Sequence, residues 1–274
     1  MPFTLIKGCF KPGAGIPDGD SVRFLANDLS LWGKLEGKPV KLGTGVQTKN
    51  TAQLRFEGID AIEKGAIQPL ATEARDNMFN LIGYDAETHP EPVGYVLARM
   101  TDDKSGRPIC FVFAGKTAKK DGSEIFLDSA MLRDSVNYQQ AKAGFAYPLY
   151  YNTLFASFRH EFNAAIKFAK KKGWGYWPQD KTQQGVIVKN HDALKTIPPI
   201  WPKLWRRLDE FLRNNNTLAG FIDFLAEGNE RIDILSIMEE RGLEDLVEVQ
   251  GNRVRLLEPP ENLRVVGKAG YRNR

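Results

Sequence analysis

The chain has 274 residues, of which 42% are hydrophobic and 26% charged, a composition typical of a globular protein and not of a disordered or fibrous one. Lys and Arg outnumber Asp and Glu by 38 to 34, so the net charge of +4 gives only weak support for a polyanionic partner. The two cysteines and three histidines are far apart in the sequence, which excludes an encoded zinc, haem or redox framework.

Neither a targeting segment nor a membrane span is indicated. The first ten residues lack the basic stretch, the apolar run and the small-residue cleavage site of a secretory signal, so we expect a cytoplasmic protein from the chain as written. If a leader peptide had been removed from the N-terminus, the protein could still be an exported one. The uncharged segment 143–158 is shorter than a span of about 20 residues and contains Pro148 and Asn152, so we expect no membrane partner.

The first part of the chain carries both strand and helix patterns. Runs rich in β-branched and aromatic residues predict five strands, at residues 4–9, 21–26, 53–59, 95–100 and 109–114. Apolar residues at helical spacing predict three helices, at residues 70–82, 127–143 and 154–169. Together they indicate an α+β fold, in which a small closed β-barrel is flanked by helices.

A composition break follows the aromatic stretch 174–178, where polar residues and then two consecutive prolines intervene. We therefore divide the chain into a first domain (residues 1–180), a linker (181–196) and a smaller C-terminal domain (197–274).

The C-terminal domain is expected to be mostly helical. The pattern predicts helices at residues 203–213, 218–226 and 231–240, followed by a β-hairpin at 246–257. This outline resembles a winged helix only at the level of fold, and the net charge of the region is near zero. We expect a protein-interaction, regulatory or self-association module rather than a dedicated DNA binder.

Three segments concentrate charged residues at strand ends or connections. They contain Asp20 (segment 16–22), Arg55, Asp60 and Glu63 (segment 54–63), and Arg107 (segment 102–108). Each segment alone has an ordinary alternative interpretation, namely a turn, a solvated strand end and a hairpin loop. Together the segments supply three carboxylates and two guanidiniums.

These residue types suit metal-assisted attack on a phosphodiester. A hard divalent cation prefers oxygen ligands, which Asp20 and Asp60 offer without His or Cys. The planar guanidiniums of Arg55 and Arg107 match phosphate oxygens and can stabilise the charge that builds up as water attacks. Glu63 is placed to orient or deprotonate that water.

The charged segments also carry a family resemblance. The matching pieces are TLIKG (4–8), DGDSVRF (18–24), LRFEGIDAIE (54–63), ATEARDNMFNLIG (71–83), DDKSGRPICFVFAG (102–115), AGFAY (143–147) and KKKGWGYWPQD (170–180). In this order, over residues 3–180, the chain resembles the thermonuclease family, the calcium-dependent nucleases of the staphylococcal nuclease type. The resemblance implies a five-stranded OB-fold barrel with three helices.

The resemblance also implies roles for single residues. Asp20, Asp60 and the backbone carbonyl of Ala61 would hold Ca²⁺, with other divalent cations possible. Arg55 and Arg107 match the two phosphate-contacting arginines, and Glu63 matches the glutamate assigned to the attacking water. The family's products carry 3′-phosphate ends.

Two further residues match substrate contacts of the family. Lys104 remains in the loop before Arg107, where the family commonly has Lys-Tyr-Gly-Arg and this chain has Ser105 in place of the aromatic residue. Tyr150 is the best match for a tyrosine that holds the nucleotide, although a buried core position suits it about equally well.

Three functional hypotheses follow. The first is a metal-dependent endonuclease that cuts DNA, RNA or both with little sequence specificity. The alternative is a catalytically silent OB-fold module that binds nucleic acid or a protein partner. A third is a nuclease that is held inactive until a partner or metal arrives, as the additional C-terminal domain suggests.

Overall fold

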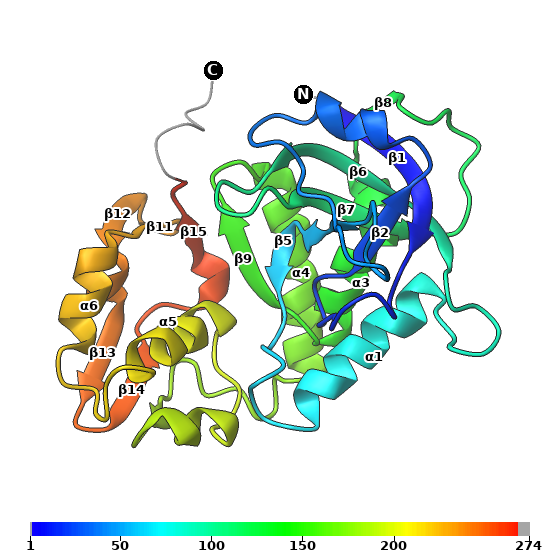
Figure 1. Cartoon of the computed structure of the whole chain (residues 1–274). Coiled ribbons are helices and arrows are strands. Elements are labelled where there is room, and N and C mark those ends of the chain that lie inside the picture. The colour runs from blue at the N-terminus through cyan, green and yellow to red at the C-terminus, as the bar shows by residue number, and fades with distance from the viewer. Residues whose placement is uncertain (1, 268–274) are drawn as a thin grey trace.

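The computed structural model describes residues 2–267 and has an α+β fold (Figure 1). Its largest sheet follows the path β3 (Ala52–Gln53), β2 (Arg23–Ala26), β1 (Phe3–Phe10), β6 (Val93–Thr101), β7 (Pro108–Ala114) and β4 (Arg55–Phe56). β3 and β4 lie at opposite ends of this path, yet only Leu54 separates them in the chain. The sheet therefore curls into a nearly closed barrel of six strands, with β8 (Glu124–Ile125) pairing on β1.

The barrel core is built from alternating apolar side chains. On β1, Ile6 and Phe10 lie on the same face and are fully buried. Two glycines, Gly8 and Gly94, stand opposite each other on β1 and β6. A Cβ on Gly94 would lie 2.3 Å from the ring of Phe10, so glycine at this position makes room for a core aromatic residue.

Four helices pack around the barrel: α1 (Leu70–Ile82), α2 (Ser129–Asp134), α3 (Val136–Ala143) and α4 (Ala156–Lys172). α1 has the bounds predicted from the sequence, and it ends at Gly83, whose left-handed backbone suits a helix C-terminus. The single helix predicted at 127–143 is instead two helices. Ser135 interrupts it, because its hydroxyl caps α3 by accepting from the backbone N–H of Tyr138 at 3.2 Å.

The C-terminal region contains more strand than expected. Its elements are α5 (Pro202–Leu212), α6 (Phe221–Gly228), β11 (Arg231–Ile234), β12 (Glu239–Gly242), β13 (Val247–Gln250), β14 (Arg253–Leu256) and β15 (Leu263–Val265). The helix predicted at 231–240 is wrong, since β11 and β12 form an antiparallel hairpin there. Only Ile232 and Ile234 of β11 are buried, which is the period of a strand. Residues 268–274 of the predicted C-terminal domain lie outside the described part of the chain.

The two parts of the chain share a sheet. Its order is β12-β11-β15-β9-β5, where β9 (Tyr147–Tyr151) and β5 (Gly58–Asp60) belong to the N-terminal part. β15 lies parallel to β9 with Arg264 opposite Tyr150, and in Figure 1 this pair joins the two lobes.

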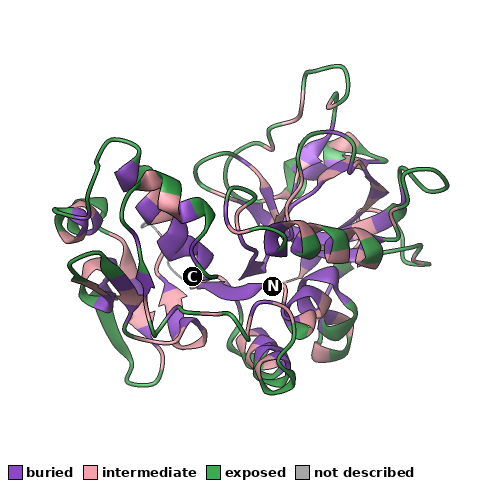
Figure 2. Cartoon of the chain, turned by 90° about the horizontal axis from the view of Figure 1, so that it is seen from below, coloured by how far each residue is buried: buried purple, intermediate pink, exposed green. Residues whose placement is uncertain are grey.

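A second buried cluster also joins the two parts. It combines Ile62, Leu70 and Tyr147 with Trp201 and Leu208 of the C-terminal region. Buried residues therefore continue from one lobe into the other (Figure 2).

The segment 181–196, predicted as a linker, is structured. It contains β10 (Val186–Ile187), which pairs with β14, and a 3₁₀ helix (His191–Lys195). Among the described residues, no helix has both the length and the apolar character that crossing a membrane requires.

Candidate functional site

Two acidic loops meet at one end of the barrel. The first is Asp18-Gly19-Asp20, just before β2, and the second follows Asp60 at the end of β5. Gly19 packs so closely on the second loop that an added Cβ would lie 2.8 Å from the Cβ of Ala61. The side chain of Gln140 donates to the carbonyl of Gly19 at 2.7 Å and so fixes the first loop on α3.

Four carboxylates, Asp18, Asp20, Asp60 and Glu63, form what we call the acidic cluster. The pKa of Asp20 is raised well above its ordinary value, first by burial and then by the negative charges of Asp18, Asp60 and Glu63. Asp18 is oriented by Ser21, whose hydroxyl donates to it at 2.6 Å. The structure thus brings together three acidic residues singled out by the sequence and adds Asp18.

Arg55 faces the acidic cluster from β4. Its Nη2 donates to the hydroxyl of Tyr151 at 3.2 Å, and its guanidinium lies over that ring, 5.4 Å from the centroid. Burial alone would lower the pKa of Arg55, but Tyr151, Asp60 and Asp20 raise it overall. Arg55 therefore stays charged beside the carboxylates.

A guanidinium from the C-terminal region occupies the acidic cluster. Arg206 of α5 binds Asp60 through both arms of its fork, with Nη1 to Oδ1 at 2.8 Å and Nη2 to Oδ2 at 2.9 Å. The same Nη1 donates to Oε1 of Glu63 at 2.7 Å. We call this three-residue contact the Arg206 bridge. Asp60 is only 3% exposed, so the bridge neutralises a buried charge.

Arg107 is engaged elsewhere. In the loop before β7 its Nε donates to Oδ2 of Asp102 at 3.1 Å. Burial would raise the pKa of Asp102, but hydrogen bonds from Ser105 and Arg107 lower it to about 2. Arg107 precedes Ile109 by two residues, and Ile109 is the register partner of Arg55. The loop that carries Arg107 therefore leads into the strand that pairs with Arg55.

The two residues matched to substrate contacts lie in different environments. Lys104 is exposed at the tip of the loop before β7. Tyr150 is 1% exposed, and its hydroxyl donates to Oδ1 of Asn163 at 2.6 Å, which places it in the core. The assignment of Tyr150 to the nucleotide is therefore corrected, because its ring and hydroxyl are both enclosed. Its neighbour Tyr151 is the tyrosine that meets Arg55.

The donor chemistry of the acidic cluster suits a hard cation. Asp20, Asp60 and the backbone carbonyl of Ala61 offer oxygen only, and burial together with the neighbouring carboxylates raises the pKa of Asp20. Within residues 2–267 there is no group of three or more His, Cys, Asp or Glu side chains arranged to hold a metal. The cation that joins Asp60 and Glu63 in this structure is Arg206.

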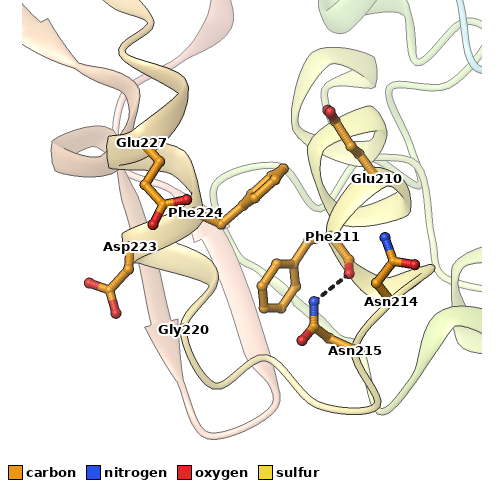
Figure 3. Close-up of a pocket in the computed structure, with 8 residues that line it drawn as sticks. All are labelled: Glu210, Phe211, Asn214, Asn215, Gly220, Asp223, Phe224 and Glu227. Carbon is orange, nitrogen blue, oxygen red and sulfur yellow. Dashed lines mark hydrogen bonds between the residues drawn. The ribbon is translucent and has the colours of Figure 1, made fainter.

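Two cavities flank α5. One of about 540 Å³ opens beside the Arg206 bridge and includes Glu63, Arg206, Asp209 and Glu210 in its lining. The other, of about 320 Å³, lies between α5 and α6 with Phe211 in its wall (Figure 3). Only the first is continuous with the acidic cluster.

A scan against protein-family models and a search of curated proteins both find no match for this chain. The functional argument therefore depends on the residues of the site.

Proposed function

We propose that the chain is a calcium-dependent nuclease that hydrolyses phosphodiester bonds of DNA, RNA or both with little sequence specificity. The observation that carries this proposal is the meeting of Arg55 with the acidic cluster at the end of the barrel. Oxygen donors for a divalent cation and a guanidinium for the phosphate are the groups that metal-assisted phosphodiester hydrolysis needs.

The shape of the sheet supports a nucleic-acid partner. A nearly closed barrel is compatible with the OB fold, which we propose for residues 1–180. OB folds commonly bind single-stranded nucleic acid along a groove of the barrel. Lys104, exposed before β7, would contact a phosphate of the bound strand.

Calcium, or another hard divalent cation, would be held by Asp20, Asp60 and the backbone carbonyl of Ala61. When bound, the ion supplies positive charge that stabilises the negative charge growing on the phosphate. The burial of Asp20 beside the carboxylates of Asp18, Asp60 and Glu63, which together raise its pKa, supports this assignment.

The protein's own residues would carry the remaining steps. Glu63 accepts a proton from water, whose oxygen forms a bond to phosphorus while the bond from phosphorus to the 5′ oxygen breaks. The departing 5′ oxygen takes a proton from solvent, and the phosphate remains on the 3′ end. Arg55 binds the non-bridging oxygens, and Arg107, once released from Asp102, supplies a second guanidinium.

The test is incubation of single-stranded DNA and RNA with the full chain in calcium and in excess chelator. We expect 3′-phosphate products in calcium only. In the variant Glu63→Gln the single-turnover rate should fall by about 10²-fold or more, because the general base is lost. Asp76→Asn, which removes an exposed carboxylate of α1, is the matched control and should cut normally. A cleavage rate that is the same with and without chelator, or that is unchanged in Glu63→Gln, contradicts the proposal.

The Arg206 bridge favours one alternative, a catalytically silent module that binds nucleic acid or a protein partner. It occupies Asp60 and Glu63, the residues that chemistry would need. Binding of labelled single-stranded DNA without any product in calcium, magnesium or manganese, in both the parent chain and Arg206→Gln, would support this second function.

A further inference from the structure

The Arg206 bridge occupies the groups on which the proposed function depends. Both carboxylate oxygens of Asp60 accept from the guanidinium, and Glu63 accepts from the same Nη1. Building on the proposed function, we propose that Arg206 is an internal competitor for the metal site, so that α5 keeps the enzyme closed until a divalent cation displaces the guanidinium.

Competition follows from the geometry of Asp60. A cation that binds this carboxylate needs at least one of its two oxygens, and the fork of Arg206 uses both at 2.8 and 2.9 Å. A positive guanidinium and a divalent cation at the same carboxylate also repel each other, and this repulsion is strong where water is excluded. Binding of the metal and retention of the bridge therefore compete for the same carboxylate.

The bridge also withholds the water-activating group. Oε1 of Glu63 accepts from Nη1 of Arg206 at 2.7 Å, so a water molecule has to displace the guanidinium before it can bind this oxygen. The Arg206 side chain thus occupies both the proposed metal ligand Asp60 and the proposed general base Glu63. Arg55, by contrast, hydrogen-bonds to Tyr151 and leaves both carboxylates to Arg206.

The backbone of α5 is held by several contacts, so the Arg206 bridge can open by movement of the Arg206 side chain alone. Trp205 next to Arg206 donates from Nε1 to the carbonyl of Leu194 at 3.1 Å. One turn earlier, Lys203 is 5% exposed and pairs with Glu230 at 2.5 Å. Leu204 and Leu208 are fully buried in the second core. The position from which Arg206 reaches the cluster is therefore fixed.

A cavity next to the bridge can accept the displaced guanidinium. The cavity of about 540 Å³ beside the bridge is lined by Arg206 together with Asp209 and Glu210. These two carboxylates are three and four residues further along α5, which puts them on the face that Arg206 can reach. Rotation of the side chain would bring the guanidinium to these carboxylates, which Arg206 would then share with Arg213 and Arg207, without moving the helix.

The experiment measures calcium binding by titration calorimetry on the full chain, without nucleic acid. The variants Arg206→Gln and Arg206→Met remove the fork and keep a side chain of moderate length. We expect calcium to bind each of them at least about tenfold more tightly than the parent, because no charge-assisted hydrogen bonds have to be broken. Arg206→Lys keeps a charge but not the fork, and its affinity should lie between those of the parent and Arg206→Gln.

The control is Arg213→Gln, which removes a positive charge from the same cavity but does not contact Asp60 or Glu63. Its calcium affinity should match that of the parent. If calcium bound the control as tightly as it binds Arg206→Gln, the loss of any nearby positive charge would explain the effect, and the proposal would be overturned. Thermal unfolding is the second measurement. Because the metal-free Arg206→Gln leaves Asp60 buried without its partner, calcium should raise its Tm more than that of the parent.

The outcomes separate this inference from the proposed function. Unchanged calcium affinity in folded Arg206 variants, or no calcium binding by any of the proteins, overturns the competitor role. Tighter calcium binding without cleavage of DNA or RNA supports the competitor role and contradicts the nuclease. Cleavage by the parent with unchanged affinity in the variants supports the nuclease and rejects the competitor.

Discussion

Arg55 is the residue of the site whose side chain best matches a phosphate group. Its half-buried guanidinium lies between the ring of Tyr151 and the acidic cluster, so its orientation is set before any substrate binds. A preorganised charge costs no reorganisation when the phosphate becomes more negative.

The substitution Arg55→Lys tests this role. Lysine retains the charge but cannot present two parallel N–H groups, so we expect the single-turnover cleavage rate to fall by about 10²-fold. The matched control is Tyr151→Phe, which removes only the hydroxyl that accepts from Arg55. A rate for Arg55→Lys within a few-fold of the parent would show that charge alone suffices.

The identities of the site residues could be predicted from the sequence because they lie in short segments whose charged residues are out of place in a plain barrel. Asp60 and Glu63 are three residues apart, and Arg55 precedes them in the same strand run. Arg206 could not be predicted in this way. Its hydrogen bond to Asp60 joins residues that are 146 positions apart in the chain. The helical pattern of the sequence does not indicate which distant carboxylate such a side chain contacts.

Among the elements, β5 positions the site most directly, because it ends at Asp60. Gly58, its first residue, has φ of 82°, and an added Cβ would lie 2.6 Å from the buried ring of Phe162. Gly58 therefore meets two requirements at once, a left-handed backbone and close packing on α4.

The substitution Gly58→Ala should lower the free energy of unfolding by about 2–4 kcal/mol, from backbone strain and overpacking together. Gly83→Ala is the control, since its φ of 74° imposes similar strain but the added Cβ would meet open space in the described structure. We expect about 1 kcal/mol there. Urea unfolding measures both, and equal losses would show that Phe162 moves aside.

The sequence predicted α1, which has one exposed face, and missed β9, which is covered on both faces. α1 buries Ala74 and Met78 and exposes its opposite side, so its helical period is plain in the sequence. β9 is buried over Tyr147, Leu149 and Tyr150, which hides the alternation of a strand. For the same reason the sequence could not show which tyrosine of β9 faces the core.

The placement of α5 over the site depends on an ion pair with a pH dependence of its own. Glu230 binds the buried Lys203 at 2.5 Å and Arg207 at 2.8 Å. Burial would raise the pKa of Glu230, but hydrogen bonds and charge from Arg207 and Lys203 lower it to about 2. Its stabilising contribution is therefore present above the unfolded pKa of about 4.3 and is lost as pH falls toward 2.

The substitution Glu230→Gln should cost about 3 kcal/mol of unfolding free energy at pH 7, because Lys203 is left buried without its partner. The difference from the parent should shrink as pH falls from about 4.5 to about 2. Urea unfolding at several pH values measures this, and Glu239→Gln, an exposed residue paired with Arg241, is the control. A difference that is independent of pH would contradict the assignment.

The predicted division into separate domains can be tested by truncation. A chain that ends at residue 196 loses β15, the parallel partner of β9, and uncovers Ile62, Leu70 and Tyr147 of the second core. We expect this fragment to unfold without a cooperative transition or to aggregate, rather than to act as a free nuclease. Circular dichroism during heating and size-exclusion chromatography measure the outcome. A monomeric fragment that melts cooperatively would show that residues 1–196 fold without the C-terminal region.

The order of the elements along the chain has a consequence for synthesis. Arg206 lies 143 residues after Glu63, so both acidic loops have been translated long before α5 leaves the ribosome. The strand that completes the shared sheet, β15, emerges last among the described elements. A growing polypeptide therefore carries the carboxylates of Asp60 and Glu63 without their guanidinium partner until α5 has been synthesised.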